Sequence, residues 1–466
     1  MAEAAGARLL APSPSTPAAP EGARAQGPRR TVIDSRQAGP GDLFVGLPGS
    51  RTDGGVHVVQ ALSRGAWGVL ARPHHLRAMG DADGRAVRLG AEDPLAALQA
   101  LARAWRRELA AAVIAITGST GKTSTKDILA ALLAPHRATF SSPQNFNTEI
   151  GLPLALLHAP AATEILVLEL AMRGRGQISE LVAIAEPEVG VIVNVGPVHL
   201  ELLDTVENVA AAKAELIAGL EPGSTIVSPA HEPLLEPHHR DDLHTVTFGP
   251  GGDVTLVHQG PDGVTIDAGA QRLELAPSFS EAHNLNNLLA AVAAARAVGV
   301  TPRGPVAVAF SALRGQRLTL DSGIVIVNDC YNANPMSMRA ALDDLAVSAT
   351  GRRVAVLGDM LELGADEQRF HAEAGVHARR RGVELLLTVG PRARAMAAAF
   401  CPDGHPRPAA GVRVHSVEDA AAAAAALPAL LTPGDTVLIK GSRGVGLERV
   451  AQSLTDSDLT APGAND

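Results

Sequence analysis

Residues 113–126 carry the pattern in this chain that points most directly to chemistry. A short apolar run leads into a glycine loop, and the loop opens onto a predicted helix. This geometry aims backbone N–H groups and a helix N-terminus at one point, which is how proteins hold phosphate. Lys122 can add a positive charge beside the outer phosphates, and the Thr123 hydroxyl can ligate Mg²⁺. The pattern predicts that the chain binds ATP or GTP.

The loop departs from the full Walker pattern at one position. That pattern has a glycine five residues before Gly121, where this chain has Ile116. The alternative is therefore a tight strand-to-helix turn with an incidental lysine. Gly-Lys-Thr directly after a strand is uncommon by chance, which favours nucleotide binding. The shortened loop comprises Thr117, Gly118, Ser119, Thr120, Gly121, Lys122 and Thr123.

Two polar residues lie where predicted strands end. Glu169 is near the end of strand 165–170, and His199 follows strand 189–195. Ligands gather at the carboxyl ends of strands in open α/β sheets, and a carboxylate on a buried strand needs a partner. We expect Glu169 to bind Mg²⁺ beside the phosphate loop, with a salt bridge to a helix arginine as the alternative. His199 is either a satisfied loop residue or a second metal ligand.

Two more candidates lie on predicted helices. Lys213 stands among alanines on helix 206–220, and this pattern favours a lysine that faces solvent. Asn287 lies at the start of the alanine-rich helix 283–298. It could cap that helix, contact a base edge or do neither.

Aspartates follow two apolar runs in the last third of the chain. Asp329 follows run 324–328, and Asp359 follows run 353–357. One such aspartate could be a helix cap, whereas two on the same edge of a parallel sheet suggest a site. Asp329 leads into segment 330–335, where Asn-Pro favours a turn. The polar groups of that segment are therefore expected on a shaped loop.

Composition limits the function classes. The net charge of −9 argues against general electrostatic binding of nucleic acid, and 2% aromatic residues argue against base-stacking platforms. Cys330 and Cys401 have no metal-ligand spacing, so we expect neither a zinc site nor a disulfide framework. No run approaches the roughly 20 apolar residues of a membrane span, and the N-terminus lacks a secretion signal pattern. A cytoplasmic protein is expected, with a loose Pro/Ala/Gly-rich segment at 11–30.

At 466 residues the chain is too long for one hydrophobic core. Strands that alternate with helices predict α/β units with mostly parallel sheets covered on both faces. We expect a small N-terminal α/β domain at 1–108, a central ATPase-like domain at 109–312, and a C-terminal doubly wound, Rossmann-like domain at 313–466.

These motifs resemble the Mur ligase family across essentially the whole chain. Two long motifs, 328–335 and 357–364, resemble its MurF-type branch and are far more specific than the phosphate loop. The other matching segments are 34–36, 40–45, 53–54, 117–123, 145–147, Glu169, 194–199, Lys213 and 440–443.

The resemblance implies an ATP- and Mg²⁺-dependent ligase of peptidoglycan synthesis. Its substrates would be UDP-MurNAc-tripeptide and D-alanyl-D-alanine, joined through an acyl phosphate with release of ADP, by a monomeric enzyme. Lys122, Glu169, His199 and Lys213 would be the catalytic set. Thr123, Glu169, His199 and a carbamylated Lys213 would be the metal ligands, which reverses the solvent-facing interpretation of Lys213.

The resemblance also assigns binding roles. Asn287, Arg317 and Asp329 would clamp the nucleotide, although Arg314 competes with Arg317 because the junction here is Arg-Gly-Gln-Arg. The substrates would contact Asp34, Ser35, Arg36, Asn145, Asn147, Tyr331, Asn332, Asn334 and Pro335. The competing hypotheses are another amide-forming relative, such as a folylpolyglutamate synthase, and a nucleotide-binding scaffold that has lost catalysis. Neither explains the two long motifs together with Lys122, Glu169, His199 and Lys213.

Overall fold

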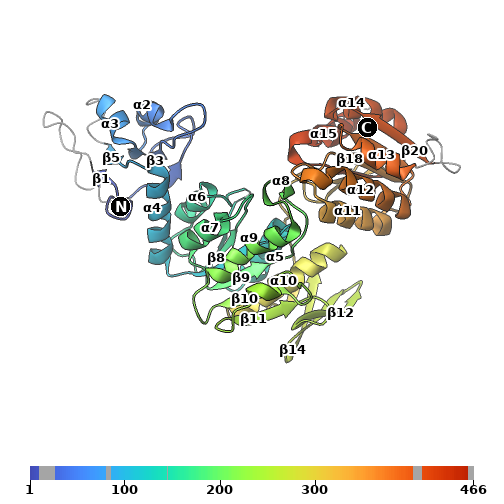
Figure 1. The fold of residues 1–466 in the computed structure, drawn as a ribbon, viewed down its shortest axis with the longest axis horizontal. Coiled ribbons are helices and arrows are strands. Elements are labelled where there is room, and N and C mark those ends of the chain that lie inside the picture. The colour runs from blue at the N-terminus through green and yellow to red at the C-terminus, as the bar shows by residue number, and fades with distance from the viewer. Residues whose placement is uncertain (10–26, 80–85, 144, 402–411, 460–466) are drawn as a thin grey trace, which may run out of the picture.

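The computed structural model describes residues 1–9, 27–79, 86–143, 145–401 and 412–459. Most of the predicted loose segment, residues 11–26, lies outside the described residues. The described chain forms three α/β units, each built on its own sheet, and Figure 1 shows them as three lobes with the central unit between the others. The expected three-unit α/β fold class is confirmed, whereas the domain boundaries remain predictions.

The N-terminal unit is a five-stranded sheet in the order β1-β5-β4-β3-β2. Strands β2 to β5 are parallel, and β1 pairs antiparallel with β5. Helix α4 leads from this unit toward the centre, and it begins where the Asp93 side chain accepts hydrogen bonds from Leu95 N and Ala96 N. The elements are β1 (Arg8–Leu9), β2 (Arg30–Val32), β3 (Asp42–Val45), η1 (Gly54–His57), α2 (Val58–Ser63), β4 (Gly68–Ala71), α3 (Pro73–Ala78), β5 (Val87–Gly90) and α4 (Pro94–Leu109).

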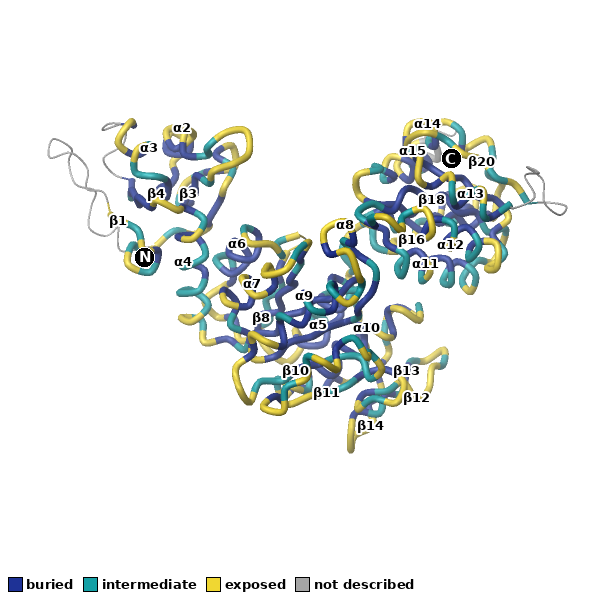
Figure 2. Tube along the Cα trace, in the orientation of Figure 1, coloured by how far each residue is buried: buried dark blue, intermediate teal, exposed yellow. Residues whose placement is uncertain are grey.

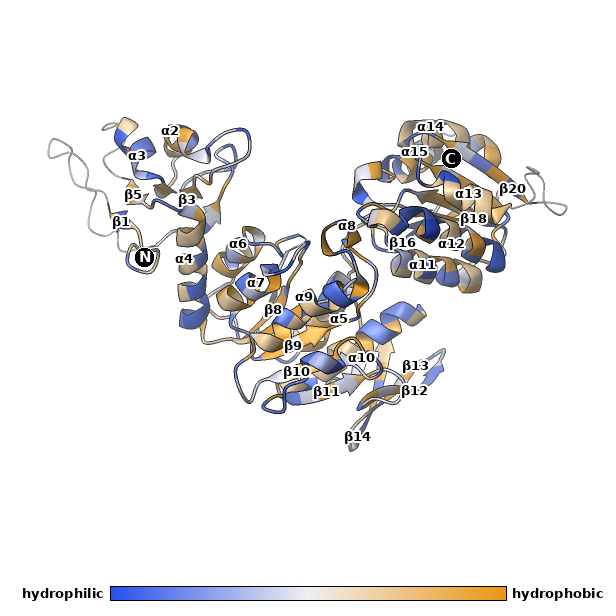
Figure 3. Cartoon of the chain, in the orientation of Figure 1, coloured by the Kyte–Doolittle hydropathy of each residue, from blue (hydrophilic) through white to orange (hydrophobic). Residues whose placement is uncertain are grey.

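The central unit places β6 (Ala112–Thr117) between β8 (Ile165–Glu169) and β9 (Val189–Ile192), all parallel. Alternate residues of β6 pack into different apolar clusters. Val113 joins the cluster of α7 (Gln177–Ala185) and α9 (Val206–Ala218), whereas Ile114 joins that of α5 (Lys122–Leu133) and α10 (Ala282–Ala297). The strand is buried on both faces, as a parallel sheet requires. Figure 2 shows the buried strands beneath their helices, and Figure 3 shows that β8 and β9 are strongly hydrophobic.

Helices cover the central sheet, and an antiparallel extension continues it. Strands β12, β13 and β14 pair antiparallel, which the prediction of a mostly parallel sheet does not anticipate. The remaining central elements are α5 (Lys122–Leu133), β7 (Thr139–Ser141), α6 (Gly151–His158), α7 (Gln177–Ala185), α8 (Leu200–Leu203), α9 (Val206–Ala218), β10 (Thr225–Pro229), η2 (Glu236–His238), β11 (His244–Phe248), β12 (Val254–Gly260), β13 (Gly263–Ala268), β14 (Gln271–Pro277), α10 (Ala282–Ala297) and β15 (Gly304–Val306).

The C-terminal unit is a six-stranded sheet in the order β16-β17-β21-β18-β19-β20. Among the described strands of this sheet, only the edge pair β16–β17 is antiparallel, so the predicted doubly wound α/β fold is confirmed. The elements are β16 (Gln316–Thr319), β17 (Val325–Asn328), α11 (Pro335–Ser348), β18 (Arg353–Gly358), η3 (Gly364–Asp366), α12 (Glu367–Arg380), β19 (Leu385–Val389), α13 (Arg394–Phe400), β20 (Arg413–Val417), α14 (Ala420–Ala426), η4 (Leu427–Leu430), β21 (Thr436–Lys440), η5 (Arg443–Val445) and α15 (Glu448–Leu459).

The central and C-terminal units share apolar packing. Leu200 and Leu203 of α8 belong to the same contiguous buried cluster as Met360 and Leu363, which follow β18. Figure 1 shows α8 at the end of the central unit nearest the C-terminal unit. Among the described helices, none is long and apolar enough to cross a membrane.

Candidate active site

A cavity of about 760 Å³ lies between the central and C-terminal units. The central unit contributes the phosphate loop from Ser119 to Thr123, together with Glu169 and His199, to its lining. The C-terminal unit contributes Asp329, Tyr331, Asn332, Asn334 and Lys440. Segments that are far apart in the sequence therefore meet at the carboxyl ends of two parallel sheets, as α/β folds arrange their ligand sites.

The phosphate loop is held by its neighbours. Gly121 has φ +80, and a Cβ atom there would lie 2.6 Å from Asn287 Oδ1, so only glycine fits. Asn194 closes the loop from the end of β9: its Oδ1 accepts from Thr120 N at 2.9 Å, and its Nδ2 donates to Thr120 O at 3.1 Å. Helix α5 begins at Lys122, so its free N–H groups face the loop. The arrangement is that of a phosphate cradle.

Lys122 lies at the mouth of this cradle. Its ammonium donates to Gly118 O at 2.8 Å, which curls the side chain back over the loop. Burial lowers the pKa of Lys122, Arg314 lowers it further, and Glu169 acts against both. A bound polyphosphate would place negative charge beside this buried ammonium and so stabilise its charged form.

Glu169 forms an oxygen-rich edge beside the loop. The strand register sets Glu169 opposite Ile116, just before the loop. Its carboxylate is 2% exposed, and it accepts from Thr123 Oγ1 at 2.6 Å and from Asn147 Nδ2 at 2.8 Å. The described hydrogen bonds of Glu169 come from a hydroxyl and an amide, not from the helix arginine of the alternative. A hydroxyl and a carboxylate are hard oxygen donors, so these residues fit Mg²⁺.

His199 faces the cavity from a strained position. It has φ +53 and precedes α8. Its Nδ1 lies 2.5 Å from Glu362 Oε2 of the C-terminal unit. Burial lowers the pKa of His199, and the Glu362 carboxylate acts in the opposite direction. Nδ1 is thus satisfied by a residue of the other unit, and the metal-ligand role of His199 stays a prediction.

The sequence-based expectation that Lys213 faces solvent is wrong. The residue is 2% exposed on α9. Lys213 lies on the buried face of that helix, which it shares with Val209 one turn before it and Leu216 one turn after it. Burial holds the pKa of Lys213 well below its usual value, and the nearby charge of Lys122 lowers it further. Lys213 does not belong to the described cavity lining, although its charge also acts on His199.

The C-terminal wall is organised by Lys440 and Tyr331. Lys440 Nζ lies 2.6 Å from Asp329 Oδ2 and donates to Asn332 O at 3.0 Å, because β21 and β17 are neighbours. The Arg314 guanidinium lies 4.0 Å above the Tyr331 ring, in cation–π contact. The Tyr331 hydroxyl donates to Asn145 Oδ1 of the central unit. Asn334 caps α11 and donates to Ser119 O at 3.4 Å.

Arg317 and Pro335 also lie outside the described lining of the cavity. Arg317 bonds to Asp344 at 2.6 Å and to Ser348 at 2.9 Å, and Arg314 rather than Arg317 belongs to the described cavity lining. Pro335 is the first residue of α11 and lines a smaller pocket of about 380 Å³. Asn287, by contrast, lines the main cavity beside Gly121.

The suggestion that two aspartates face one cleft holds only for Asp329. Asp359 is buried, and its Oδ1 accepts from Ala393 N at 2.7 Å. Gly390 passes so close that a Cβ atom there would lie 2.6 Å from this carboxylate. Asp359 therefore ties β18 to the segment after β19, and it lies outside the described lining of the cavity.

The predicted uridine-side residues lie together in the N-terminal unit, away from the described cavity lining. Arg36 pairs with Asp34 at 2.7 Å, and this pairing holds the pKa of Asp34 at about 2. Ser35 is buried and its Oγ donates to Gln60 Oε1 at 2.7 Å. A substrate that contacts both regions must therefore be long.

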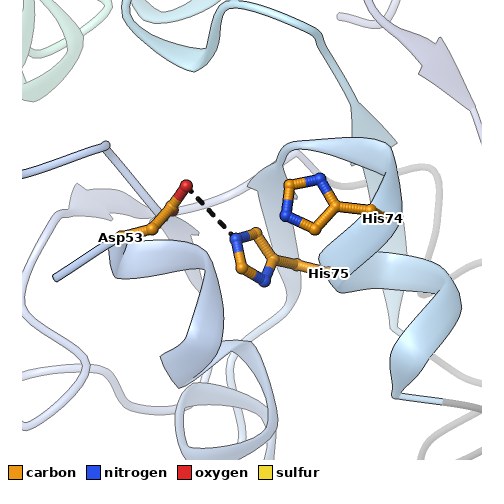
Figure 4. Close-up of side chains that lie close together, drawn as sticks. All are labelled: Asp53, His74 and His75. Atoms are coloured by element: carbon orange, nitrogen blue, oxygen red, sulfur yellow. Dashed lines mark ion pairs between the residues drawn. The ribbon is translucent and has the colours of Figure 1, made fainter.

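Asp53, His74 and His75 form a further cluster in this unit, shown in Figure 4. His75 Nε2 lies 3.2 Å from Asp53 Oδ2, but Arg72 also lies 3.2 Å from the same oxygen. Asp53 Oδ1 accepts from Gly55 N. This carboxylate already has a cation and a backbone donor, so its charge is compensated within the unit.

Sequence reasoning assigned no role to three residues that the geometry brings to the site, although two of them lie in matching segments. Lys440 ends β21 next to Asp329, and the rule that strand ends carry ligands would have found it. Glu362 lies within one of the two long motifs, yet nothing in its spacing predicts a contact with His199. Arg173 follows β8 by four residues and lines the cavity.

Comparison with known proteins decides the family. Residues 116–295 match the Mur ligase middle domain, and residues 313–443 match the Mur ligase, glutamate ligase domain. The chain belongs to the Mur ligase family. The first match contains the phosphate loop, Glu169, His199 and Lys213, and the second contains the cavity wall from Asp329 to Lys440. The resemblance predicted from the motifs is confirmed.

Individual Mur ligases are similar over nearly the whole chain. UDP-N-acetylmuramoyl-tripeptide–D-alanyl-D-alanine ligase of Bacillus subtilis is 34% identical, with 92% of this chain and 93% of the relative covered. The enzyme of that name from Mycobacterium tuberculosis is 36% identical over 91% and 92%. A crystal structure of the MurF ligase from Thermotoga maritima in complex with ADP has a TM-score of 0.78 and 29% identity, and it covers 92% of this chain and 98% of its own.

Proposed function

We propose that this chain joins D-alanyl-D-alanine to the terminal carboxylate of a UDP-MurNAc-tripeptide, with conversion of ATP to ADP and phosphate. The observation that carries the proposal is the cavity in which the phosphate loop and the Thr123–Glu169 edge face Tyr331, Asn332 and Lys440. The ligases named for this reaction are similar over more than nine-tenths of their length, which supports the same substrates. The product would be the UDP-MurNAc-pentapeptide used for peptidoglycan.

The reaction needs activation because a carboxylate is a poor electrophile. Transfer of the γ-phosphoryl group of ATP to a carboxylate oxygen gives an acyl phosphate and ADP. The dipeptide amine then attacks the acyl carbon, the C–O bond to phosphate breaks, and the amine loses a proton. Charge builds on phosphoryl oxygens throughout, so positioning and electrostatic neutralisation supply most of the catalysis.

The residues of the cavity fit this division of work. Lys122 and the N–H groups of Gly118 to Thr123 bind the phosphates, while Asn287, Asp329 and one of Arg314 and Arg317 hold the nucleoside part. Thr123, Glu169 and His199 would hold Mg²⁺, which supplies positive charge at the phosphoryl oxygens. Asn145 and Asn147 would contact the UDP-MurNAc-tripeptide, and Tyr331, Asn332, Asn334 and Pro335 would shape the pocket for D-alanyl-D-alanine. Asp34, Ser35 and Arg36 would hold the uridine end.

Lys213 would serve as an anionic oxygen ligand after carbamylation. Its burial lowers the pKa of the amine, so the neutral form that can attack CO₂ is available. The N–C bond forms as one C–O double bond opens, and the nitrogen loses a proton, which leaves a carbamate. A buried carbamate would balance the positive charge of Lys122, whereas a buried ammonium would add to it.

Replacement of Lys213 tests this role. We expect Lys213→Ala to lower kcat by at least about 100-fold, because a metal ligand is lost. Added acetate or formate should restore part of the rate by filling the vacated space with a carboxylate. Wild-type turnover should fall in CO₂-depleted buffer, whereas the variant should not respond to CO₂. Near-normal turnover in Lys213→Ala would show that the carbamate is not needed.

A coupled assay for ADP release tests the function itself. Purified protein with ATP, Mg²⁺ and UDP-MurNAc-tripeptide should release ADP only when D-alanyl-D-alanine is added. ADP release with free diaminopimelate or glutamate in place of D-alanyl-D-alanine would support the hypothesis of another amide-forming relative. ATP binding without turnover with any of these acceptors would support the scaffold hypothesis.

A further inference from the structure

The contact between His199 and Glu362 joins two units at the metal edge of the cavity. His199 comes from the segment after β9 in the central unit, and Glu362 comes from the segment after β18 in the C-terminal unit. Their side chains meet at 2.5 Å, between Nδ1 and Oε2. A carboxylate can only accept, so His199 Nδ1 carries the proton and donates it. The other ring nitrogen, Nε2, then has a free lone pair.

The Glu362 carboxylate is itself held in place. Its Oε1 lies 3.8 Å from Arg173 Nε, so each oxygen faces a different partner. Glu362 O also accepts from Glu201 N at 3.3 Å, which pairs the two backbones beside the side-chain contact. A Cβ atom at Gly364 would lie 3.2 Å from the backbone of Leu200, so the loop and α8 approach closely. The side-chain contact is thus one part of a fitted interface.

Backbone strain occurs on both sides of this contact. His199 has φ +53 and Glu362 has φ +63, in the left-handed region that non-glycine residues rarely adopt. Such conformations persist only where the surroundings enforce them, and they gather at functional sites. Here the apolar cluster that includes Leu200, Leu203, Met360 and Leu363 holds both segments. Two residues with positive φ that meet across an interface therefore support a functional role for this contact.

We propose that Glu362 is a positioning residue that fixes the ring of His199 for the second Mg²⁺ ion, so that docking of the C-terminal unit completes the metal site. A metal-binding histidine commonly donates its other ring N–H to a carboxylate, which sets its tautomer and orientation. This inference rests on the metal role given to His199 under the proposed function. The proposal adds Glu362 of the C-terminal unit to the metal site, so the site would be complete only when both units are together.

Binding of Mn²⁺ in place of Mg²⁺ tests the proposal without turnover. The protein is saturated with the β,γ-imido analogue of ATP, and bound Mn²⁺ is counted by electron paramagnetic resonance. We expect Glu362→Ala to weaken the second ion by about 10- to 100-fold and to leave the first ion unchanged. Glu362→Gln keeps an acceptor but loses the charge, so its effect should be intermediate. With ¹⁵N-labelled histidine, the nitrogen coupling to Mn²⁺ should be lost in Glu362→Ala.

Glu367→Gln is the matched control. Glu367 lies five residues further along the same segment and pairs with Arg392 at 2.7 Å, away from His199. It should keep both Mn²⁺ ions and the nitrogen coupling. Circular dichroism and thermal melting establish that each variant is folded.

Three outcomes separate the explanations. Unchanged Mn²⁺ binding in folded Glu362→Ala would mean that Glu362 only links the two units, and would overturn the proposal. Tighter Mn²⁺ binding would overturn it as well, because the carboxylate would then hold His199 away from the ion. Two Mn²⁺ ions with nitrogen coupling in a wild-type protein that shows no ligase activity would remove the proposed function but leave the role of Glu362 standing.

Discussion

At the scale of single residues, the two arginines of the junction differ in what they touch. Arg314 lies over Tyr331 in the cavity, and its buried Nε has no hydrogen-bond acceptor among the described residues. Arg317 is already paired with Asp344 and Ser348. A cation without an anionic partner at a phosphate site is available to the ligand. The sequence-based choice of Arg317 stays a prediction, but the placement favours Arg314.

Separate alanine variants distinguish the two arginines. We expect Arg314→Ala to lower kcat/KM for ATP by about 100-fold, in the range found when one charge-stabilising group is removed. Arg317→Ala should lower it by less than about fivefold, because exposed ion pairs contribute at most about 1 kcal/mol. Steady-state kinetics, with melting temperatures as a folding control, measure both. A larger loss in Arg317→Ala at an unchanged melting temperature would restore the original choice.

Residue types and spacing predicted the phosphate loop and Glu169 because both follow simple rules about strand ends. They failed for Lys213 because its adjacent alanines were considered, whereas the helical spacing to Val209 and Ile217, four residues away on either side, places it on the apolar face. The contact of His199 with Glu362 was beyond sequence reasoning, because 163 positions separate the partners.

At the scale of elements, His371 connects α12 to the loop that carries Glu362. It is fully buried, its Nε2 accepts from Met360 N at 2.9 Å, and its Nδ1 lies 2.6 Å from Glu367 O, to which it donates. Both bonds require the neutral ring, and burial lowers the pKa of His371. The unfolded chain takes up a proton near pH 6.5, which the folded chain resists. Stability from this group is therefore present above about pH 6.5 and is lost as pH falls below it.

Hydrogen exchange of segment 358–372 measures this dependence. After correction for intrinsic exchange rates, the opening free energy of the wild type should fall below pH 6.5 with a slope of up to about 1.4 kcal/mol per pH unit. His371→Gln should be less protected at pH 7.5, because the ring bonds are altered, but its profile should be flatter at low pH. Parallel profiles for the two proteins would mean that another group is responsible.

The buried parallel strands were predicted from their apolar runs, whereas the antiparallel hairpins of the central unit were not. Strands β8, β17 and β18 were predicted within a residue or two, as 165–170, 324–328 and 353–357, because buried parallel strands are continuous apolar runs. The antiparallel β12–β14 extension was missed, although β13 alternates buried and half-buried residues and begins at an Asp-Gly turn. The turn signal was present in the sequence, and attention to period-two alternation would have found it.

At the scale of the whole molecule, the predicted site residues are divided among three units. The phosphate loop belongs to the central unit, Tyr331 and Lys440 belong to the C-terminal unit, and the Asp34–Arg36 pair belongs to the N-terminal unit. The composition and length predicted several units, but no local pattern could predict how they face one another. That arrangement depends on contacts such as Tyr331 with Asn145 and Asn334 with Ser119.

This division predicts closure when ligands bind. The residues proposed to bind the nucleotide and the dipeptide come from different units, so simultaneous binding should draw those units together and exclude water from the acyl phosphate. We expect the radius of gyration from small-angle X-ray scattering to fall when the β,γ-imido analogue of ATP, UDP-MurNAc-tripeptide and D-alanyl-D-alanine are all present. The analogue alone should give a smaller change, because it need not bridge every unit. Tyr331→Phe removes one hydrogen bond between units, so its radius of gyration should fall by less. Identical wild-type scattering curves with and without all three ligands would show that the units are already in their working arrangement.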